Sequence, residues 1–147
     1  MQDTEKTRDL IHRELWAFES SAEQTPGGDP SSYVWVQFMK PKIRDYAKME
    51  KDTYTRIHQA RIKAGEMKNW HFMSRVFPSG TDADFEFVTV NVFAQKDWKW
   101  NDKTVESVLG KEEAAKLADP TTFRTTVREE LWRPLLRAIP SQKSQNF

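Results

Sequence analysis

The longest regular pattern of apolar and polar residues runs from Ile43 to Ala64 and predicts an amphipathic helix. At about 100° of rotation per residue, the apolar face carries Ile43, Tyr46, Ala47, Tyr54, Ile57 and Ala64. The opposite face carries Lys48, Lys51, Asp52, Thr55, Gln59 and Lys63. Gly65 follows directly, at a position where glycine commonly ends a helix.

Strand-like segments lie on both sides of this helix. Residues 33–39 (YVWVQFM) are rich in β-branched and aromatic side chains and are followed by Pro41, which is typical of a strand. Residues 69–77 (NWHFMSRVF) and 85–94 (FEFVTVNVFA) have the same character. The sequence PSGTD between them predicts an antiparallel hairpin with a long loop.

The two ends of the chain contain similar segments. IHRELW and VREELW share the order apolar, basic, any residue, Glu, Leu, Trp. Residues 123–131 could form a helix or a strand, but Pro134 disfavours a long helix there. We therefore predict strands for residues 10–18 and 123–131. A second helix is predicted for residues 105–118, with an interruption at Gly110.

The predicted order is strand, helix, strand, strand, helix, strand, with an additional strand at the N-terminus. This is the βαββαβ order of the ferredoxin-like fold, which belongs to the α+β class. The length of 147 residues fits a single domain. Within it we expect an N-terminal strand and linker over residues 1–32, a ferredoxin-like core over 33–139 and a tail over 140–147.

Both faces of the predicted sheet are apolar. Alternation places Tyr33, Trp35, Met39, Phe85, Phe87 and Phe93 on one face, and Val34, Val36, Phe38, Val88, Val90 and Val92 on the other. Two helices cover only one face of a four-stranded sheet, so the second face needs another cover. A second copy of the chain is the simplest cover, which predicts a homodimer.

Three segments resemble an uncharacterised bacterial branch of the dimeric α/β-barrel superfamily: YVWVQFMKPKIRDYAKME, IHQARIKAGEMKNW and FPSGTDADFEFVTVNVF. That superfamily is similar in fold to antibiotic-biosynthesis monooxygenases and haem-degrading monooxygenases. The resemblance covers about residues 33–93. It implies two ferredoxin-like subunits whose sheets close into one barrel, with the helices outside. It implies little about chemistry, because one fold hosts many functions. The Asn, Trp and His set of haem-degrading members has no secure counterpart in Asn69, Trp70 and His71.

Composition excludes several classes of function. The 23 basic and 22 acidic residues give no basic excess, so we expect no nucleic-acid partner. The chain contains no cysteine, which rules out thiolate catalysis and cysteine-ligated metals. Its three histidines lack the short spacing of a metal site, and we expect neither a metal nor a cofactor.

No apolar stretch approaches the roughly 18 residues of a membrane span, so we expect no membrane partner. The start MQDTEK does not resemble a signal peptide, which makes a cytoplasmic location the default expectation. The sequence does not show whether a leader has been removed.

Glu50 lies near the centre of the apolar face of the predicted helix. A carboxylate there must be hydrogen-bonded, paired or neutral. Tyr54 and His58 follow at spacings of four, so the three side chains form a polar ladder that could face a cleft between helix and sheet. Alternatively, Glu50 belongs to a buried structural network with a tyrosine or a strand arginine such as Arg75.

Several strand residues are candidates for binding a ligand. Alternation sends Trp70 and His71 to opposite faces of the sheet. Asn91, together with Thr89 and Gln37, interrupts the aromatic face with polar groups that could orient a flat or amphipathic ligand. Cross-strand hydrogen bonding and core packing explain the same residues equally well.

Three functions remain open. The first is the binding of a small, partly apolar or aromatic molecule by Tyr54, Trp70, His71 and Asn91. The second is a cofactor-independent monooxygenase or isomerase that uses Glu50 or His58 as general base. The third is a structural dimerisation domain without a ligand.

Overall fold

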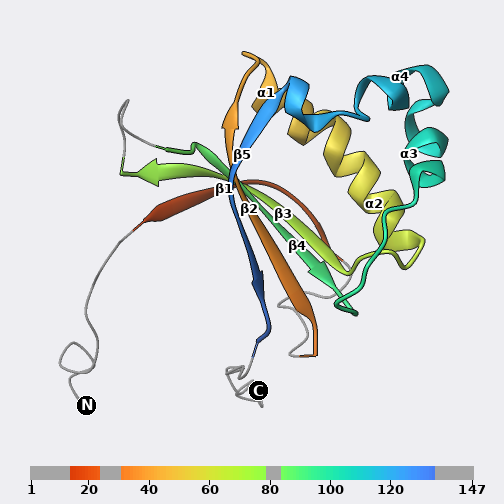
Figure 1. Cartoon of the computed structure of the whole chain (residues 1–147), viewed down its shortest axis with the longest axis horizontal. Helices are drawn as coiled ribbons and strands as arrows, with labels where there is room; N and C mark the ends of the chain where they lie inside the picture. Colours follow the sequence, from red (N-terminus) through yellow and green to blue (C-terminus); the bar gives the residue numbers. More distant parts are fainter. Residues whose placement is uncertain (1–13, 24–30, 79–83, 135–147) are drawn as a thin grey trace, which may run out of the picture.

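The computed structural model describes residues 14–23, 31–78 and 84–134, which form an antiparallel sheet with helices on one side (Figure 1). In chain order the elements are β1 (Leu15–Glu23), β2 (Tyr33–Pro41), α1 (Tyr46–Met49), η2 (Glu50–Tyr54), α2 (Thr55–Lys63), β3 (Asn69–Phe77), β4 (Phe87–Phe93), α3 (Asp102–Leu109), α4 (Lys111–Lys116), η3 (Pro120–Thr122) and β5 (Arg124–Trp132). Within the described ranges, no helix is long and apolar enough to cross a membrane.

The five strands lie in the order β1-β3-β4-β2-β5, and every neighbouring pair is antiparallel. This α+β arrangement is consistent with a ferredoxin-like fold to which β1 is added beside β3. The Leu-Trp pairs that end the two similar sequence segments lie on the two edge strands of the sheet, Leu15 and Trp16 in β1 and Leu131 and Trp132 in β5.

The first difference from the sequence prediction concerns the N-terminal strand. Strand β1 continues to Glu23, although the sequence predicted a strand that ends at residue 18. Its last four residues pair with residues 69–72 of β3, because a register shift after Phe18 lets the strand continue. Of the predicted N-terminal strand, residues 10–13 lie outside the described residues. So do residues 79–83 of the hairpin loop and residues 135–147, which include the predicted tail.

The second difference concerns Phe85. Alternation placed it on the same face as Phe87, but it packs with Phe38 and Val88 on the opposite face. Strand β4 begins only at Phe87, and Glu86 makes backbone hydrogen bonds to both Met39 and Arg75. Regular alternation therefore does not extend back to Phe85.

The predicted long helix forms over Tyr46–Lys63 as α1, η2 and α2 in succession. Its middle turn, η2, is π-helical, and the Thr55 amide donates its hydrogen bond to the Glu50 carbonyl five residues earlier. The Thr55 hydroxyl donates to the same carbonyl at 3.3 Å. Turns of this kind insert one extra residue into an α-helix and are frequent at functional sites. Ile43 precedes the helix and is exposed rather than buried.

The core lies between the helices and the facing side of the sheet. Tyr46, Trp70, Phe72, Met39 and Phe93 are almost completely buried there. The predicted interruption of the second helix is confirmed, because α3 and α4 meet at Gly110. This residue has a φ of 81°, a conformation that glycine adopts without strain. After α4 the chain runs back through η3 to the start of β5 (Figure 1).

The other face of the sheet, which we call the open face, carries a smaller aromatic cluster. Phe38, Phe85 and Val88 are buried within it, and Trp16 stacks on Phe85 with 5.8 Å between ring centroids. The Arg128 guanidinium lies 4.0 Å above the Phe38 ring. Towards the two edges, Phe18 is 71% exposed and Trp132 is 59% exposed.

Candidate functional site

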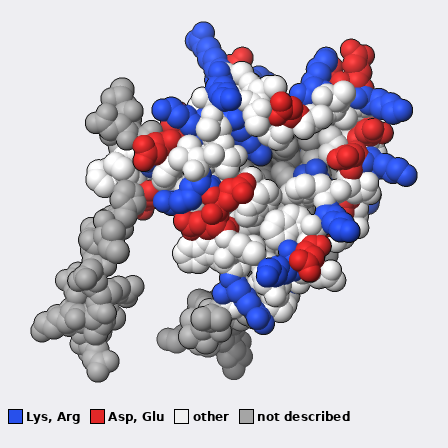
Figure 2. Space-filling view, viewed as in Figure 1, with Lys and Arg blue, Asp and Glu red and all other residues white. Residues whose placement is uncertain are grey.

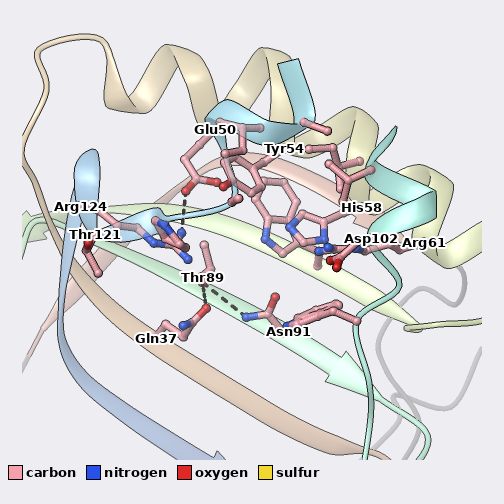
Figure 3. A pocket seen from close by; sticks show the side chains of 18 of the residues that line it. Gln37, Glu50, Tyr54, His58, Arg61, Thr89, Asn91, Asp102, Thr121 and Arg124 are labelled. Atoms are coloured by element: carbon pink, nitrogen blue, oxygen red, sulfur yellow. Dashed lines mark hydrogen bonds and ion pairs between the residues drawn. The ribbon is translucent and has the colours of Figure 1, made fainter. Parts of the chain in front are cut away.

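A cavity of about 1040 Å³ lies between the helices and the sheet. Glu50, Tyr54 and His58 reach into it from the η2–α2 helix, and Figure 3 shows them above Gln37, Thr89 and Asn91 of the strands. Arg124 lies at one end of this view and Arg61 at the other. Residues of α3 and α4 complete the wall.

Glu50 occupies the first position of the π turn and is only 1% exposed. Its Oε1 accepts hydrogen bonds from the Tyr46 hydroxyl at 2.5 Å and from Nη1 of Arg124 at 3.1 Å. Its Oε2 is buried without a hydrogen-bond partner among the described residues. Burial raises the pKa of this carboxyl, while the charge of Arg124 and the Tyr46 hydroxyl oppose that shift.

Arg124 is the first residue of β5 and supplies the positive charge at this end of the cavity. Its Nη1 donates to Glu50 and, at 3.4 Å, to the Tyr46 hydroxyl. Its Nε is buried and has no hydrogen-bond partner in the part of the chain that the structure describes. The pairing with Glu50 thus provides a hydrogen bond to Nη1 of Arg124 and to Oε1 of Glu50, but none to Nε or to Oε2.

His58 lies one helical turn after Tyr54 and stacks on Trp70, with 4.7 Å between ring centroids. Its Nδ1 lies 3.2 Å from the sulfur of Met67. Burial lowers the pKa of His58 well below its ordinary value, and the charges of Arg61 and Arg124 add to this effect. The imidazole is therefore neutral at pH 7 and adds no charge to the cavity.

The strand residues form a hydrogen-bonded floor. Gln37 donates to Glu129 at 2.9 Å, and the Thr89 hydroxyl donates to the Gln37 oxygen at 3.5 Å. Asn91 donates to the Thr89 hydroxyl at 3.4 Å and to the backbone oxygen of Trp35 at 3.2 Å. This chain of bonds fixes the orientation of both amides.

Aromatic side chains form much of the remaining wall. Trp35, Tyr54, Trp70 and Trp100 all line the cavity. The Arg61 guanidinium lies 4.0 Å above the Trp100 ring, and its Nε is 3.8 Å from Glu66, which is too far for a hydrogen bond. Burial raises the pKa of Tyr54 to about 12, so its hydroxyl stays protonated near neutral pH.

Most of the side chains predicted to form a site meet in this cavity. Glu50, Tyr54, His58, Trp70 and Asn91 all line it. His71 does not, because strand alternation turns it to the open face. There it lies 3.5 Å from a carboxylate oxygen of Glu23 and packs edge-on against Phe18.

The partner of Glu50 is Arg124, not the Arg75 suggested by the sequence. Arg75 lies on the open face, with its guanidinium 4.7 Å from the centre of the Phe85 ring. The sequence analysis also missed Arg61, which lies one turn after Ile57 on the buried side of the helix. Its helical spacing from Ile57 and His58 was the available signal.

Among the described residues, no group of three potential ligands could hold a metal ion. The polar side chains that line the cavity include carboxyl, guanidinium, imidazole, indole, amide and hydroxyl groups.

We predict that His58 makes the folded protein less stable in acid. The folded protein resists protonation of His58 while the unfolded chain does not, so stability is lost as pH falls through about 6.5. Between pH 7.5 and 5.5 this effect lowers the free energy of unfolding by about 1 kcal/mol. His58→Phe keeps an aromatic ring against Trp70 but does not titrate. Urea unfolding at both pH values should show a smaller acid loss in the variant, and equal losses would contradict this assignment.

No protein-family model matches the chain, and neither a curated protein nor a solved structure is significantly similar to it. The geometry of the cavity is therefore the basis for assigning a function.

Proposed function

We propose that the protein binds a small, flat, partly apolar or aromatic molecule in the cavity between the helices and the sheet. One observation carries this proposal. Four buried polar atoms on the cavity-lining residues have no hydrogen-bond partner in the described ranges: Glu50 Oε2, Arg61 Nε, Trp70 Nε1 and Arg124 Nε. A buried polar group without a partner costs about 1–3 kcal/mol, so a bound molecule that supplies the missing partners would be stabilised there.

The composition of the wall suits such a ligand. Ligand sites are usually concave and mostly apolar, with a few polar groups that fix the orientation of the bound molecule. Here the rings of Trp35, Tyr54, Trp70 and Trp100 supply flat apolar surfaces, and Asn91 is held in one orientation by its hydrogen bonds.

A purely structural network would explain fewer of the buried polar atoms than a ligand site does. The bonds from Tyr46 and Arg124 to Glu50 explain one carboxylate oxygen and one guanidinium nitrogen. They leave the second oxygen and Nε of Arg124 unexplained, and both groups belong to a wall of the same cavity.

Binding of the neutral dye N-phenyl-1-naphthylamine, whose fluorescence rises in apolar sites, tests the proposal. Ala114 is half-buried in the cavity wall, so Ala114→Trp should narrow the cavity and weaken dye binding by at least about tenfold, or about 1.4 kcal/mol. Ala64 is exposed at the end of α2 and does not line the cavity, so Ala64→Trp is the matched control. Equal dye binding by both variants would contradict the proposal.

The second candidate is a cofactor-independent monooxygenase or isomerase. It is favoured by the free Oε2 of Glu50, because a carboxyl whose pKa is raised by burial is a stronger base than an exposed one. As general base, Glu50 would remove a proton from carbon next to a carbonyl group of the substrate. His58 is the alternative base, but its lowered pKa makes it a weaker one.

The enolisable ketone 2-tetralone provides a test of this chemistry. If Glu50 is the base, the protein should accelerate deuterium exchange at the carbon next to the carbonyl in D2O, as followed by NMR. Glu50→Gln should remove this acceleration and keep dye binding, whereas His58→Phe should keep both. Exchange at the buffer rate with the unaltered protein would exclude 2-tetralone as a substrate and leave the binding function.

We also propose that the protein is a homodimer in which two open faces pack together, as in the dimeric α/β-barrel superfamily that the sequence resembles. Support comes from the apolar side chains at the centre of this face, where Val36, Met73 and Val90 are only half-buried. Charges of both signs accompany them on the same face, in Arg128 and Glu130. Such a surface can pair with a copy of itself, as a two-fold interface requires. Figure 2 likewise shows acidic and basic side chains interspersed on the visible surface.

Light scattering at micromolar concentration should give twice the chain mass of 17.3 kDa. Val90→Asp places a charge at the centre of the open face and should give a monomer. Ile43→Asp is the control, because Ile43 is an exposed apolar residue that lies outside the sheet. A monomeric unaltered protein would contradict the dimer. A dimer that binds no dye would instead be a dimerisation domain.

A further inference from the structure

One edge of the guanidinium of Arg124, a residue that lines the cavity, has no hydrogen-bond partner among the described residues. A guanidinium carries five N–H donors, and Nε with one terminal nitrogen forms an edge whose two N–H bonds are parallel. Within the described residues, Arg124 makes its hydrogen bonds through Nη1, which donates to Glu50 and Tyr46. Its Nε is buried and unpartnered within the described residues, so this edge is the unused one.

We propose that the bound molecule carries a carboxylate, and that the free edge of Arg124 binds it through two parallel hydrogen bonds. This inference rests on the proposed binding function and names the chemical class of its ligand. Two parallel N–H bonds match the two oxygens of a carboxylate, which is the usual bidentate geometry of arginine. The aromatic wall then contacts the flat apolar part of the same molecule.

Arg124 is held in place before any ligand arrives. Its side chain is 11% exposed, and Glu50 fixes one terminal nitrogen of the guanidinium. The ring centres of Tyr54 and Phe123 lie 5.9 and 5.8 Å from the guanidinium carbon. A donor pair that is already oriented loses little conformational entropy on binding, which favours affinity.

The charges buried around the cavity also favour an anion. Arg61 and Arg124 are positive, His58 is neutral, and Glu50 is the one buried acidic group among the described residues that line the cavity. The other acidic lining residues are exposed to water, which screens their charge: Asp102, Glu106, Glu112 and Glu129.

Glu50 does not block the ligand carboxylate. It occupies Nη1, while the proposed ligand uses the other edge of the guanidinium. Burial also opposes a charge on Glu50, because it raises the pKa of this carboxyl.

The test compares 2-naphthoate with 2-naphthamide, which has nearly the same shape but no charge. Each competes with N-phenyl-1-naphthylamine for the unaltered protein. We expect 2-naphthoate to bind at least about tenfold more tightly, because a charge-assisted bidentate pair is stronger than a neutral hydrogen bond. Equal affinities would overturn the carboxylate inference and leave the binding function standing. Failure of the dye and of both competitors to bind would instead overturn the proposed function, and the inference with it.

Variants of Arg124 test where the carboxylate binds. Arg124→Gln should remove the preference for 2-naphthoate, while the affinity for 2-naphthamide stays within about twofold. Arg124→Lys keeps the charge but not the paired donors, and should give an intermediate preference. Arg44→Gln, at an exposed arginine outside the cavity, should change neither affinity. An unchanged preference in folded Arg124→Gln would overturn the assignment. If neither Arg124 variant folds, the comparison of the two competitors on the unaltered protein decides.

Discussion

The pairing of Glu50 with Arg124 is the constraint on which the rest of the site depends. It joins the π turn of the long helix to the first residue of the last strand, 74 positions later in the sequence. Two buried ions recover their lost hydration only if the geometry is good and further hydrogen bonds are made. Tyr46 supplies one such bond, but Oε2 of Glu50 and Nε of Arg124 have no hydrogen-bond partner among the described residues. The pair thus joins helix and strand while one polar atom of each ion stays without a partner in this part of the chain.

The two faces of the sheet lie in different environments, one towards the cavity and the other on the open face. Thr89 and Asn91 of β4 face the cavity, whereas Val88 and Val90, which alternate with them, face the open side. The same division separates Trp70 from His71 on β3. One side of the sheet thus combines aromatic rings with polar groups that fix an orientation, and the other side is apolar with charges of both signs. This division explains why a site and a subunit interface can both be proposed for so small a domain.

The local pattern of apolar and polar residues was sufficient to predict much of this structure. The spacing of apolar residues predicted the long helix, and the position of Glu50 on its apolar face indicated a buried carboxyl that needs a partner. The identity of that partner was not predictable, because Arg124 reaches Glu50 only through the placement of β5 beside β2. The position of Phe85 was also missed, since alternation holds only where the strand is regular. The π turn could not be predicted from the amino-acid composition, because it depends on which backbone carbonyl accepts the hydrogen bond of each amide.

The π turn also makes the site depend on the hydrogen-bond pattern of the helix. Its wider turn contains one residue more than an α-helix would need between the segment before Glu50 and the segment after Tyr54. If this turn formed regular α-helix with no residue removed, the two segments would rotate against each other by about 100°. With Ile57 and His58 kept in the core, Tyr46 and Glu50 would turn away from Arg124. The helix would survive as a helix, yet the carboxyl and the guanidinium would no longer meet.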